Sequence, residues 1–327
     1  MPEISVIVPV FNAGKRLVSS INSLLNQTFE NLEIIIVNDA STDNSAEIID
    51  RLASDNKNII SIQLSDNLGV HEARLVGIKR ASAPWIGFLD SDDFARPSMF
   101  KKLYNAAIEQ NVDIVVCGSY RVTPDRRIIS PKIQFPRNKR IDADIFSRFC
   151  EFEFGTGTLW NRLYRKDIIE QWADMHFPWR QRINEDLLLN LGCFYNANSV
   201  YLMKDMLHEY VYNELSVTSS IDKTKAYVET YRAYALAVKI FISKGDSVIA
   251  SIIAMYRRQL TSSPYYIENV SDLRKYDKDL GEAANLILES APFALAAILS
   301  TNHRYQIISF SFIKKTLRFF FKYFKKI

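Results

Sequence analysis

Three carboxylates lie within four residues directly after an apolar segment of the chain. Residues 85–89 (WIGFL) are followed by Asp90, Ser91, Asp92 and Asp93. Like charges this close repel one another, so the cluster is favourable only when a cation lies among the acids. Mg²⁺ or Mn²⁺ held by one or two protein carboxylates completes its shell with water and phosphate oxygens. The cluster therefore predicts a divalent metal and a nucleotide-activated substrate. The alternative is that Asp92 or Asp93 simply caps the next helix.

A second acid follows another apolar segment at the same kind of position. Residues 33–38 (EIIIVN) lead into Asp39, and residues 40–45 (ASTDNS) have the composition of a loop and a helix N-cap. In an open parallel sheet, ligands bind in the crevice beyond the carboxyl ends of the strands. We therefore expect Asp39 and residues 90–93 to face one pocket.

The alternation of strand and helix patterns predicts an α/β fold. Runs rich in Ile and Val are typical of strands buried on both faces, and segments with one apolar helical face separate them. The predicted strands are residues 4–10, 32–37, 59–64, 85–89 and 113–116, and the predicted helices are residues 16–26, 45–53 and 99–110. This order indicates a doubly wound sheet with right-handed crossovers.

The turn after the first strand argues against two common nucleotide-binding classes. Residues 9–14 (PVFNAG) contain a single glycine, whereas the dinucleotide fingerprint G-x-G-x-x-G requires several. The sequence also has no P-loop motif. The nucleotide is therefore expected to be held through its base, its ribose and a metal-bound diphosphate.

Four motifs occur in one order along the first part of the chain. They are residues 5–12 (SVIVPVFN), residues 36–43 (IVNDASTD), residues 67–69 (NLG) with Ala73, Arg74 and Gly77, and residues 88–93 (FLDSDD). This set resembles the family-2 inverting glycosyltransferases of the bacterial surface-polysaccharide type. The resemblance implies the GT-A nucleotide-diphospho-sugar transferase fold, with a doubly wound, mostly parallel sheet and a helical C-terminal extension. Ala40 departs from the glycine usual in the family, and we expect only a slightly altered loop because alanine is small.

The resemblance also implies a donor site for a nucleotide sugar, typically UDP-linked. Asp39 is expected to accept hydrogen bonds from the base, and Arg74 to brace the nucleotide side; the alternative for Arg74 is a surface helix cation. The metal, Mn²⁺ or Mg²⁺, is expected on Asp92, with Asp93 as the alternative ligand. The other expected nucleotide-sugar contacts are Pro9, Phe11, Asn12, Asp90 and Ser91.

The second half of the chain is expected to supply the base and the acceptor site. An inverting transfer is a single displacement, so it needs a group that removes the acceptor hydroxyl proton but no covalent nucleophile. Glu185 and Asp186 open an apolar helical segment and resemble the Glu-Asp motif of the family, which implies Asp186 as general base with Glu185 orienting it. The alternative is a charged first helical turn that favours the helix dipole. Trp160 and Asn161 are candidate acceptor contacts, against the alternative of a buried structural Trp.

Composition and length indicate one catalytic domain with additions. The chain has 327 residues, of which 48% are hydrophobic, enough for a large core. We expect a GT-A domain at 1–220, with a nucleotide-sugar half at 1–120 and an acceptor half at 121–220, then a helical region at 221–304. Three widely spaced cysteines form no zinc motif or convincing disulfide framework, which fits a reducing compartment.

The C-terminal segment 305–327 is predicted to form a basic amphipathic helix. Residues 313–327 hold six cations and no acid, and on a helical wheel the cations separate from a wide aromatic face. Such a helix is typical of binding in the interface of an anionic membrane and does not favour nucleic acid. The alternative is docking on its own domain or on a second subunit.

Together these features predict a glycosyltransferase that moves a hexosyl or N-acetylhexosaminyl group, with inversion, from a UDP-sugar to a glycan or lipid-linked acceptor. Capsule, exopolysaccharide or lipopolysaccharide synthesis fits this activity. We expect a cytoplasmic enzyme, peripheral at the cytosolic face of the inner membrane. Two alternatives remain: a non-catalytic membrane-associated assembly subunit of GT-A fold, and a metal-dependent nucleotidyltransferase. The missing triphosphate loop after the first strand argues against the second.

Overall fold

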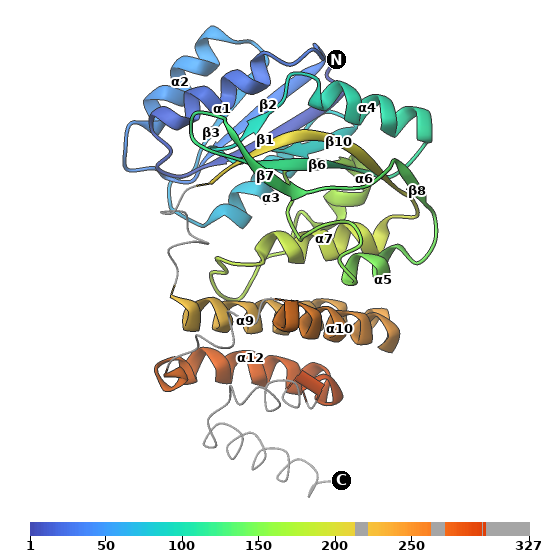
Figure 1. The fold of residues 1–327 in the computed structure, drawn as a ribbon. Helices are drawn as coiled ribbons and strands as arrows, with labels where there is room; N and C mark the ends of the chain where they lie inside the picture. The colour runs from blue at the N-terminus through green and yellow to red at the C-terminus, as the bar shows by residue number, and fades with distance from the viewer. Residues whose placement is uncertain (213–221, 263–271, 296, 299–327) are drawn as a thin grey trace, which may run out of the picture. The chain divides into compact units, whose positions relative to one another are not determined.

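The computed structural model describes residues 1–212, 222–262, 272–295 and 297–298 (Figure 1). The chain divides into two compact units, Met1–Ser216 and Val217–Ile327. The predicted amphipathic helix at 305–327 lies outside the described residues. Among the residues that the structure describes, no helix is long and apolar enough to cross a membrane.

The first unit is built on a ten-stranded mixed sheet whose main path runs β3-β2-β1-β4-β9-β6-β10-β5 (Figure 1). Its strands are β1 (Ile4–Val10), β2 (Leu32–Asn38), β3 (Ile59–Gln63), β4 (Trp85–Phe88), β5 (Phe94–Ala95), β6 (Ile114–Val122), β7 (Ile128–Ile133), β8 (Lys139–Ile141), β9 (Arg162–Arg165) and β10 (Val200–Val211). Strands β3, β2, β1 and β4 are parallel to one another, so the carboxyl ends of these strands share one edge. The predicted doubly wound, mostly parallel fold is confirmed.

Strands β1 and β2 are buried along their whole length, as expected for runs of Ile and Val covered by helices on both faces. Pro9 is tolerated in the central strand β1 because the ladder to β4 ends at the pair Ile7 and Phe88. Beyond that point, the missing N–H of Pro9 has no β4 partner to lose.

Helices cover both faces of this sheet. They are α1 (Lys15–Leu25), α2 (Ser45–Asp55), α3 (Val70–Arg80), α4 (Met99–Gln110), α5 (Ile145–Cys150), α6 (Lys166–Ile169) and α7 (Glu185–Asn196), with a short 3₁₀ turn at Glu170–Trp172. Helix α3 was not among the predicted helices because it is buried on several sides and includes the polar residues His71 and Arg74. It packs so closely on β1 that a Cβ at Gly77 would lie 2.4 Å from Ile7 Cγ2.

The strand β9 is the main departure from a simple parallel order. It lies between β4 and β6 and is antiparallel to both. Its sequence, RLYR, has no apolar run that would signal a buried strand. Arg162 is nevertheless fully buried, because its guanidinium donates to the carbonyls of Phe154 at 3.0 Å and Thr156 at 2.6 Å.

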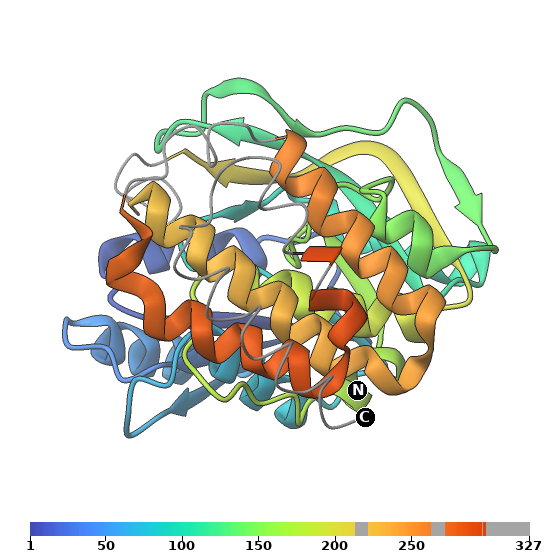
Figure 2. The ribbon, with the colours of Figure 1, turned by 90° about the horizontal axis from the view of Figure 1, so that it is seen from below.

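The second unit is helical, as its composition predicts. It contains α9 (Lys223–Phe241), α10 (Asp246–Ser262) and α12 (Asp277–Ser290), with 3₁₀ turns at Ile242–Lys244 and Leu273–Tyr276. Helix α9 contacts both α10 and α12 and lies between them in Figure 2. Tyr234 of α9 donates to Gln259 at 2.7 Å and its ring contacts Tyr256, while Arg232 pairs with Asp279 at 3.0 Å.

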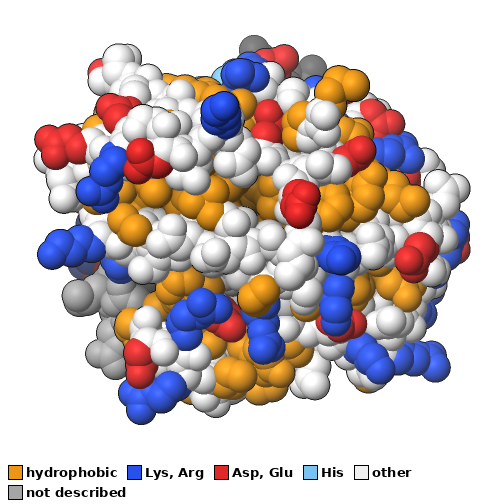
Figure 3. All heavy atoms as spheres, turned by 90° about the horizontal axis from the view of Figure 1, so that it is seen from above, with side chains coloured by type: hydrophobic (Ala, Val, Ile, Leu, Met, Phe, Trp, Pro, Cys, Tyr) orange, Lys and Arg blue, Asp and Glu red, His pale blue; other side chains and the backbone are white. Residues whose placement is uncertain are grey.

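The surface seen from above in Figure 3 carries Lys and Arg side chains interspersed with Asp and Glu, and hydrophobic side chains show between them. Apolar atoms contribute much of any folded protein's surface, so such scattered patches are ordinary. The described residues on this face show no patch of a single charge that would indicate a binding surface, whereas the candidate acids lie at the strand ends.

Candidate active site

Arg74 is the centre of a cluster of acids at the strand ends. Its guanidinium is 3% exposed and lies 3.0 Å from Asp90, 3.3 Å from Glu185 and 2.5 Å from Asp186. We name these four residues the Arg74 cluster. Asp90 follows β4, whereas Glu185 and Asp186 open α7, so the cluster joins the two halves of the first unit.

The first turn of α7 is fixed by a buried amide further along the same helix. Asn190 donates to the carbonyl of Gly157 at 2.7 Å and accepts a hydrogen bond from the Tyr164 hydroxyl at 2.7 Å. It also donates to the carbonyl of Asp186 at 3.2 Å. Because α7 is tied in this way to β9 and to the loop before it, Asp186 is held rigidly against Arg74.

Acidic groups in the Arg74 cluster outnumber its one cation, and the pKa values show the consequence. Burial raises the pKa of Asp90 to about 6, with Asp186 and Asp92 adding to the shift and Arg74 opposing it. Burial and the charge of Asp186 hold the pKa of Glu185 well above its usual range, and a hydrogen bond with Asp186 supports the protonated form. Burial lowers the pKa of Arg74, but the three acids outweigh it and the net shift is upward. The cluster therefore favours a proton or a further cation.

Asp39 lies at the N-terminus of α3. Its two carboxylate oxygens accept hydrogen bonds from the backbone N–H groups of Leu68 at 2.7 Å and Gly69 at 2.9 Å, and Asn67 donates to its carbonyl at 3.0 Å. A carboxylate there is favoured by the helix dipole. We call residues 38–42 and 67–69 the Asp39 rim. Each carboxylate oxygen keeps a lone pair beyond these bonds, so the expected contact with a nucleotide base stays a prediction.

The loops after β1 and β2 are tied together beside Asp39. Asn12 accepts a hydrogen bond from the Thr42 N–H at 2.8 Å, and its own N–H donates to Ser41 at 3.0 Å. Phe11 is 48% exposed at this rim, while Pro9 is buried within β1. Ala40 has a φ of 52°, so the loop keeps the left-handed conformation that glycine favours instead of altering to suit alanine.

Asp92 and Asp93 differ in their surroundings. Burial raises the pKa of Asp92, while Arg16 and a hydrogen bond from the backbone N–H of Asp92 itself oppose the shift. Such an acid fits a cation ligand. Asp93, in contrast, is 1% exposed, accepts a hydrogen bond from the Val211 N–H at 2.8 Å and lies 3.5 Å from His208 Nε2. The second oxygen of Asp93 has no hydrogen-bond partner among the described residues, and the alternative role of Asp93 as metal ligand stays a prediction.

No group of three or more His, Cys, Asp or Glu side chains that could hold a metal occurs among residues 1–212 and the other described segments. These residues do not form a metal cage made by the protein alone, and the metal expected on Asp92, with substrate oxygens completing its shell, stays a prediction.

Trp160 and Asn161 are buried and contact other parts of the protein, whereas acceptor contacts are expected to be accessible. Asn161 is fully buried, donates to the Cys117 carbonyl at 2.7 Å and accepts from the Thr158 hydroxyl at 3.1 Å. Trp160 is 2% exposed and stacks on His208 with ring centres 4.1 Å apart. The acceptor role of both residues remains a prediction, and this geometry favours the structural alternative.

Two side chains near the acids were not predicted as site residues from the sequence. His71 of α3 contacts the carbonyl of Met175 at 2.6 Å and stacks on Phe177, which orders the segment leading to α7. Lys132 of β7 lies with its ammonium 3.6 Å from the ring centre of Tyr210. Single His and Lys residues carry no motif, so only their neighbours in space mark them.

The model of the family described as glycosyl transferase family 2 matches residues 5–172, more than half of the chain. The chain belongs to this family. Family 2 membership confirms the resemblance seen in the motifs, makes the chain a glycosyltransferase, and disfavours the nucleotidyltransferase alternative.

Individual relatives agree with the family 2 assignment. The chain is 34% identical over 221 residues to a protein named uncharacterized glycosyltransferase EpsJ, from Bacillus subtilis, covering 67% of this chain and 63% of EpsJ. Its fold is similar to that of S. aureus TarS 1–349 in complex with UDP-GlcNAc, with a TM-score of 0.70, 20% identity, and coverage of 93% of this chain and 90% of that one. A mannosyltransferase from Pyrobaculum calidifontis in complex with GDP-Man and Mn²⁺ matches with a TM-score of 0.54 and 14% identity, over 97% of this chain and 83% of that one. These structures confirm the GT-A fold for this family 2 member.

Proposed function

We propose that this family 2 enzyme transfers a sugar from a UDP-sugar to a glycan or lipid-linked saccharide, with inversion, in the synthesis of a bacterial surface polysaccharide. The observation that carries the proposal is the Arg74 cluster. One guanidinium contacts Asp90, which ends the donor-side motif, and Asp186, the candidate base, although these two acids lie far apart in the sequence. Donor and acceptor chemistry can therefore meet at one point.

The proposed reaction is a single displacement at the anomeric carbon. The acceptor hydroxyl oxygen forms the new bond to that carbon, and its proton passes to the carboxylate of Asp186. The bond from the anomeric carbon to the diphosphate oxygen breaks, and the nucleoside diphosphate leaves with the bonding electrons. Glu185, whose pKa is raised by burial and by Asp186, is hydrogen-bonded to Asp186 and orients it. The transferred group is a hexosyl or N-acetylhexosaminyl unit.

A divalent cation, Mn²⁺ or Mg²⁺, is proposed as cofactor, with Asp92 as its protein ligand. Bound there, it would neutralise charge on the diphosphate leaving group. Asp90 and Ser91 lie beside Asp92 in the same motif and are proposed to contact the donor, while the Asp39 rim with Phe11 and Asn12 is proposed to hold the nucleoside. The similarity to a fold that binds UDP-GlcNAc supports the UDP assignment.

The experiment for this proposal is a thermal-shift screen of UDP-, GDP-, dTDP- and CMP-sugars with and without Mn²⁺. A ligand that binds only the native state stabilises it by mass action and so raises Tm. At a ligand concentration a hundredfold above Kd, the free energy of unfolding rises by about 2.7 kcal/mol. We expect a Mn²⁺-dependent rise with UDP-sugars that Asp92→Asn removes. A shift confined to another nucleotide would reject UDP, and the absence of any shift would reject the donor site.

The proposed location is the cytosolic face of the inner membrane, held there through residues 305–327. The charge pattern of that segment supports this, since each cation near an anionic leaflet contributes about 1 kcal/mol. Co-sedimentation with anionic liposomes should be lost on deletion of residues 313–327. Binding that is unchanged by the deletion would remove the membrane assignment while leaving the transferase proposal intact.

A further inference from the structure

The two faces of one strand pair carry cations in different surroundings. Strands β6 and β10 run parallel, with Glu209 opposite Tyr120 and Tyr210 opposite Arg121. Successive side chains of a strand point to opposite faces of the sheet, so Glu209 and Tyr210 lie on opposite faces. Each face can therefore be compared with the other on the same backbone.

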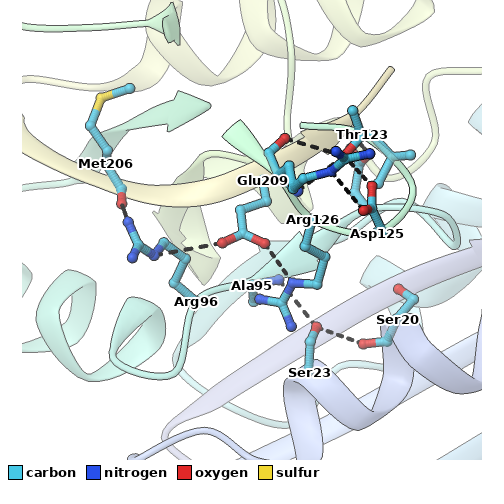
Figure 4. A network of polar contacts seen from close by, with 12 residues as sticks. Ser20, Ser23, Ala95, Arg96, Thr123, Asp125, Arg126, Met206 and Glu209 are labelled. Carbon is cyan, nitrogen blue, oxygen red and sulfur yellow. Dashed lines mark hydrogen bonds and ion pairs between the residues drawn. The ribbon is translucent and has the colours of Figure 1, made fainter. Parts of the chain in front are cut away.

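On the first face, a buried acid holds two arginines (Figure 4). Arg126 Nε donates to Glu209 at 2.7 Å, and Arg96 Nε lies 3.7 Å from the other oxygen of the same carboxylate. The Arg126 guanidinium also lies over the ring of Phe94, 4.6 Å from its centre. Glu209 is 7% exposed, so this carboxylate is committed to the two cations.

On the second face, two cations have aromatic neighbours, and no carboxylate of the described residues lies within ion-pair distance of either. The Lys132 ammonium lies 3.6 Å from the ring centre of Tyr210, and the Arg121 guanidinium lies 5.4 Å from that of Tyr212. Across the described ranges of the chain, neither Lys132 nor Arg121 forms an ion pair with a carboxylate. The Nε of Arg121 is buried and has no hydrogen-bond acceptor.

These two cations are close enough to affect each other. Burial lowers the pKa of Lys132, and the positive charge of Arg121 lowers it further, while Asp93 opposes the shift. Asp93 accepts the Val211 N–H through one oxygen, and it forms no ion pair with Lys132 or Arg121 among the described residues. The buried Nε of Arg121 lacks an acceptor, which costs free energy, and two neighbouring cations on one face favour an anion between them.

The position of these cations relative to the acids indicates which substrate would supply the anion. In the sheet, β6 is separated from β4 by β9, which places it about 10 Å from the strand that leads to Asp90, at the usual strand spacing. The donor diphosphate is proposed to lie at Asp92, directly after β4. A group held at β6 and β7 is thus two strands away from the proposed diphosphate position, in the half of the unit that is expected to bind the acceptor.

We propose that Arg121 and Lys132 form an anion subsite that binds a phosphate or carboxylate group of the acceptor substrate. A guanidinium and an ammonium together suit such a group, because the first offers a planar fork of donors and the second a compact charge. The assignment to the acceptor rests on the proposed transferase function. The donor diphosphate is the other possible source of the same chemistry, and the experiment separates the two.

The test uses the full chain and inorganic phosphate as probe. Phosphate is titrated calorimetrically at constant ionic strength, against chloride, with and without saturating UDP and Mg²⁺. We expect saturable binding that persists when UDP is bound. The double variant Arg121→Gln/Lys132→Gln should weaken phosphate binding by about tenfold or more, since each lost charge-assisted hydrogen bond is substantial. Arg126→Gln is the matched control, because Glu209 already neutralises that arginine, and it should keep the wild-type affinity.

Three results would overturn the proposal: no saturable phosphate binding, displacement of phosphate by UDP, or equal weakening in Arg126→Gln. If the double variant does not fold, Lys132→Gln alone is informative, because this side chain is only half-buried and should still weaken binding several-fold. Failure of the proposed donor site can be told apart from failure of the anion subsite. It would appear as a loss of UDP binding in the wild type, independent of the result for phosphate.

Discussion

The Asp39 rim and the Arg74 cluster lie at the same edge of the sheet but are built in opposite ways. In the Asp39 rim, one carboxylate receives backbone N–H groups from Leu68 and Gly69, and the surrounding loops are hydrogen-bonded to one another. In the Arg74 cluster, three carboxylates share one guanidinium. The first arrangement is satisfied by the protein alone, whereas the second has an excess of negative charge.

This difference separates positioning from chemistry. A rim whose polar groups are already paired is preorganised and can hold a nucleoside without rearranging. A cluster whose pKa values are shifted by burial and by neighbouring acids is typical of a site where protons or cations move. Substitutions in the cluster should therefore affect turnover most, and substitutions in the rim should affect stability mildly.

The largest effect is expected for Asp186→Asn. The amide cannot accept the acceptor proton, so the transfer rate should fall by about 10²- to 10⁴-fold, the usual contribution of a general base. Donor binding, measured by thermal shift with a UDP-sugar, should remain. Asp246→Asn, an exposed acid in the first turn of α10, is the control and should keep full activity. Wild-type turnover in Asp186→Asn would show that another group is the base.

Arg74→Gln should damage the cluster through stability as well as turnover. Removing the cation leaves Asp90, Glu185 and Asp186 without their partner, and breaking a buried ion pair in this way costs about 3–5 kcal/mol. Urea denaturation should show the loss, and Arg80→Gln, at the exposed end of the same helix, should not. Equal stability of the two variants would mean that Arg74 does not hold the cluster together.

His71, which orders the segment leading to α7, should make the stability of the protein depend on pH. Burial lowers the pKa of His71 to about 4 from 6.5, so the folded protein binds fewer protons than the unfolded chain between these values. The free energy of unfolding is therefore undiminished by His71 above pH 6.5, and it falls by up to about 3 kcal/mol as the pH drops towards 4. The slope of unfolding free energy against pH in this window should flatten in His71→Gln. The control His176→Gln changes an imidazole that is 57% exposed, and an equal change in both variants would contradict the assignment.

The smallest effect is expected in the rim, at Ala40. With a φ of 52°, alanine is held in a conformation that favours glycine, so Ala40→Gly should raise stability by about 0.5–1 kcal/mol. The same change at Ala53 within α2 should lower stability by about 1 kcal/mol. Opposite signs in thermal unfolding would confirm that backbone conformation, and not side-chain loss, decides the result.

Much of the nucleotide half could be predicted from sequence because its signals are local. The strands β1 to β4 and the helices α1, α2 and α4 have strong periodic patterns, and the acids follow the strands directly in the chain. Helix α3 and strand β9 were missed because each buries an arginine, and a polar residue in a buried element disrupts the periodicity on which prediction depends.

The amino-acid sequence by itself determined the family, the parallel strands of the first half, and the acids that a donor site needs, since all of these are encoded in short segments. Only the tertiary structure decided that Arg74 contacts a base candidate 112 residues away, that Asp93 points towards His208, and that Arg121 and Lys132 lie together without an ion pair among the described residues. Such contacts depend on how distant elements pack. Charge and burial at a site are set by neighbours in space, which no local pattern of residues records.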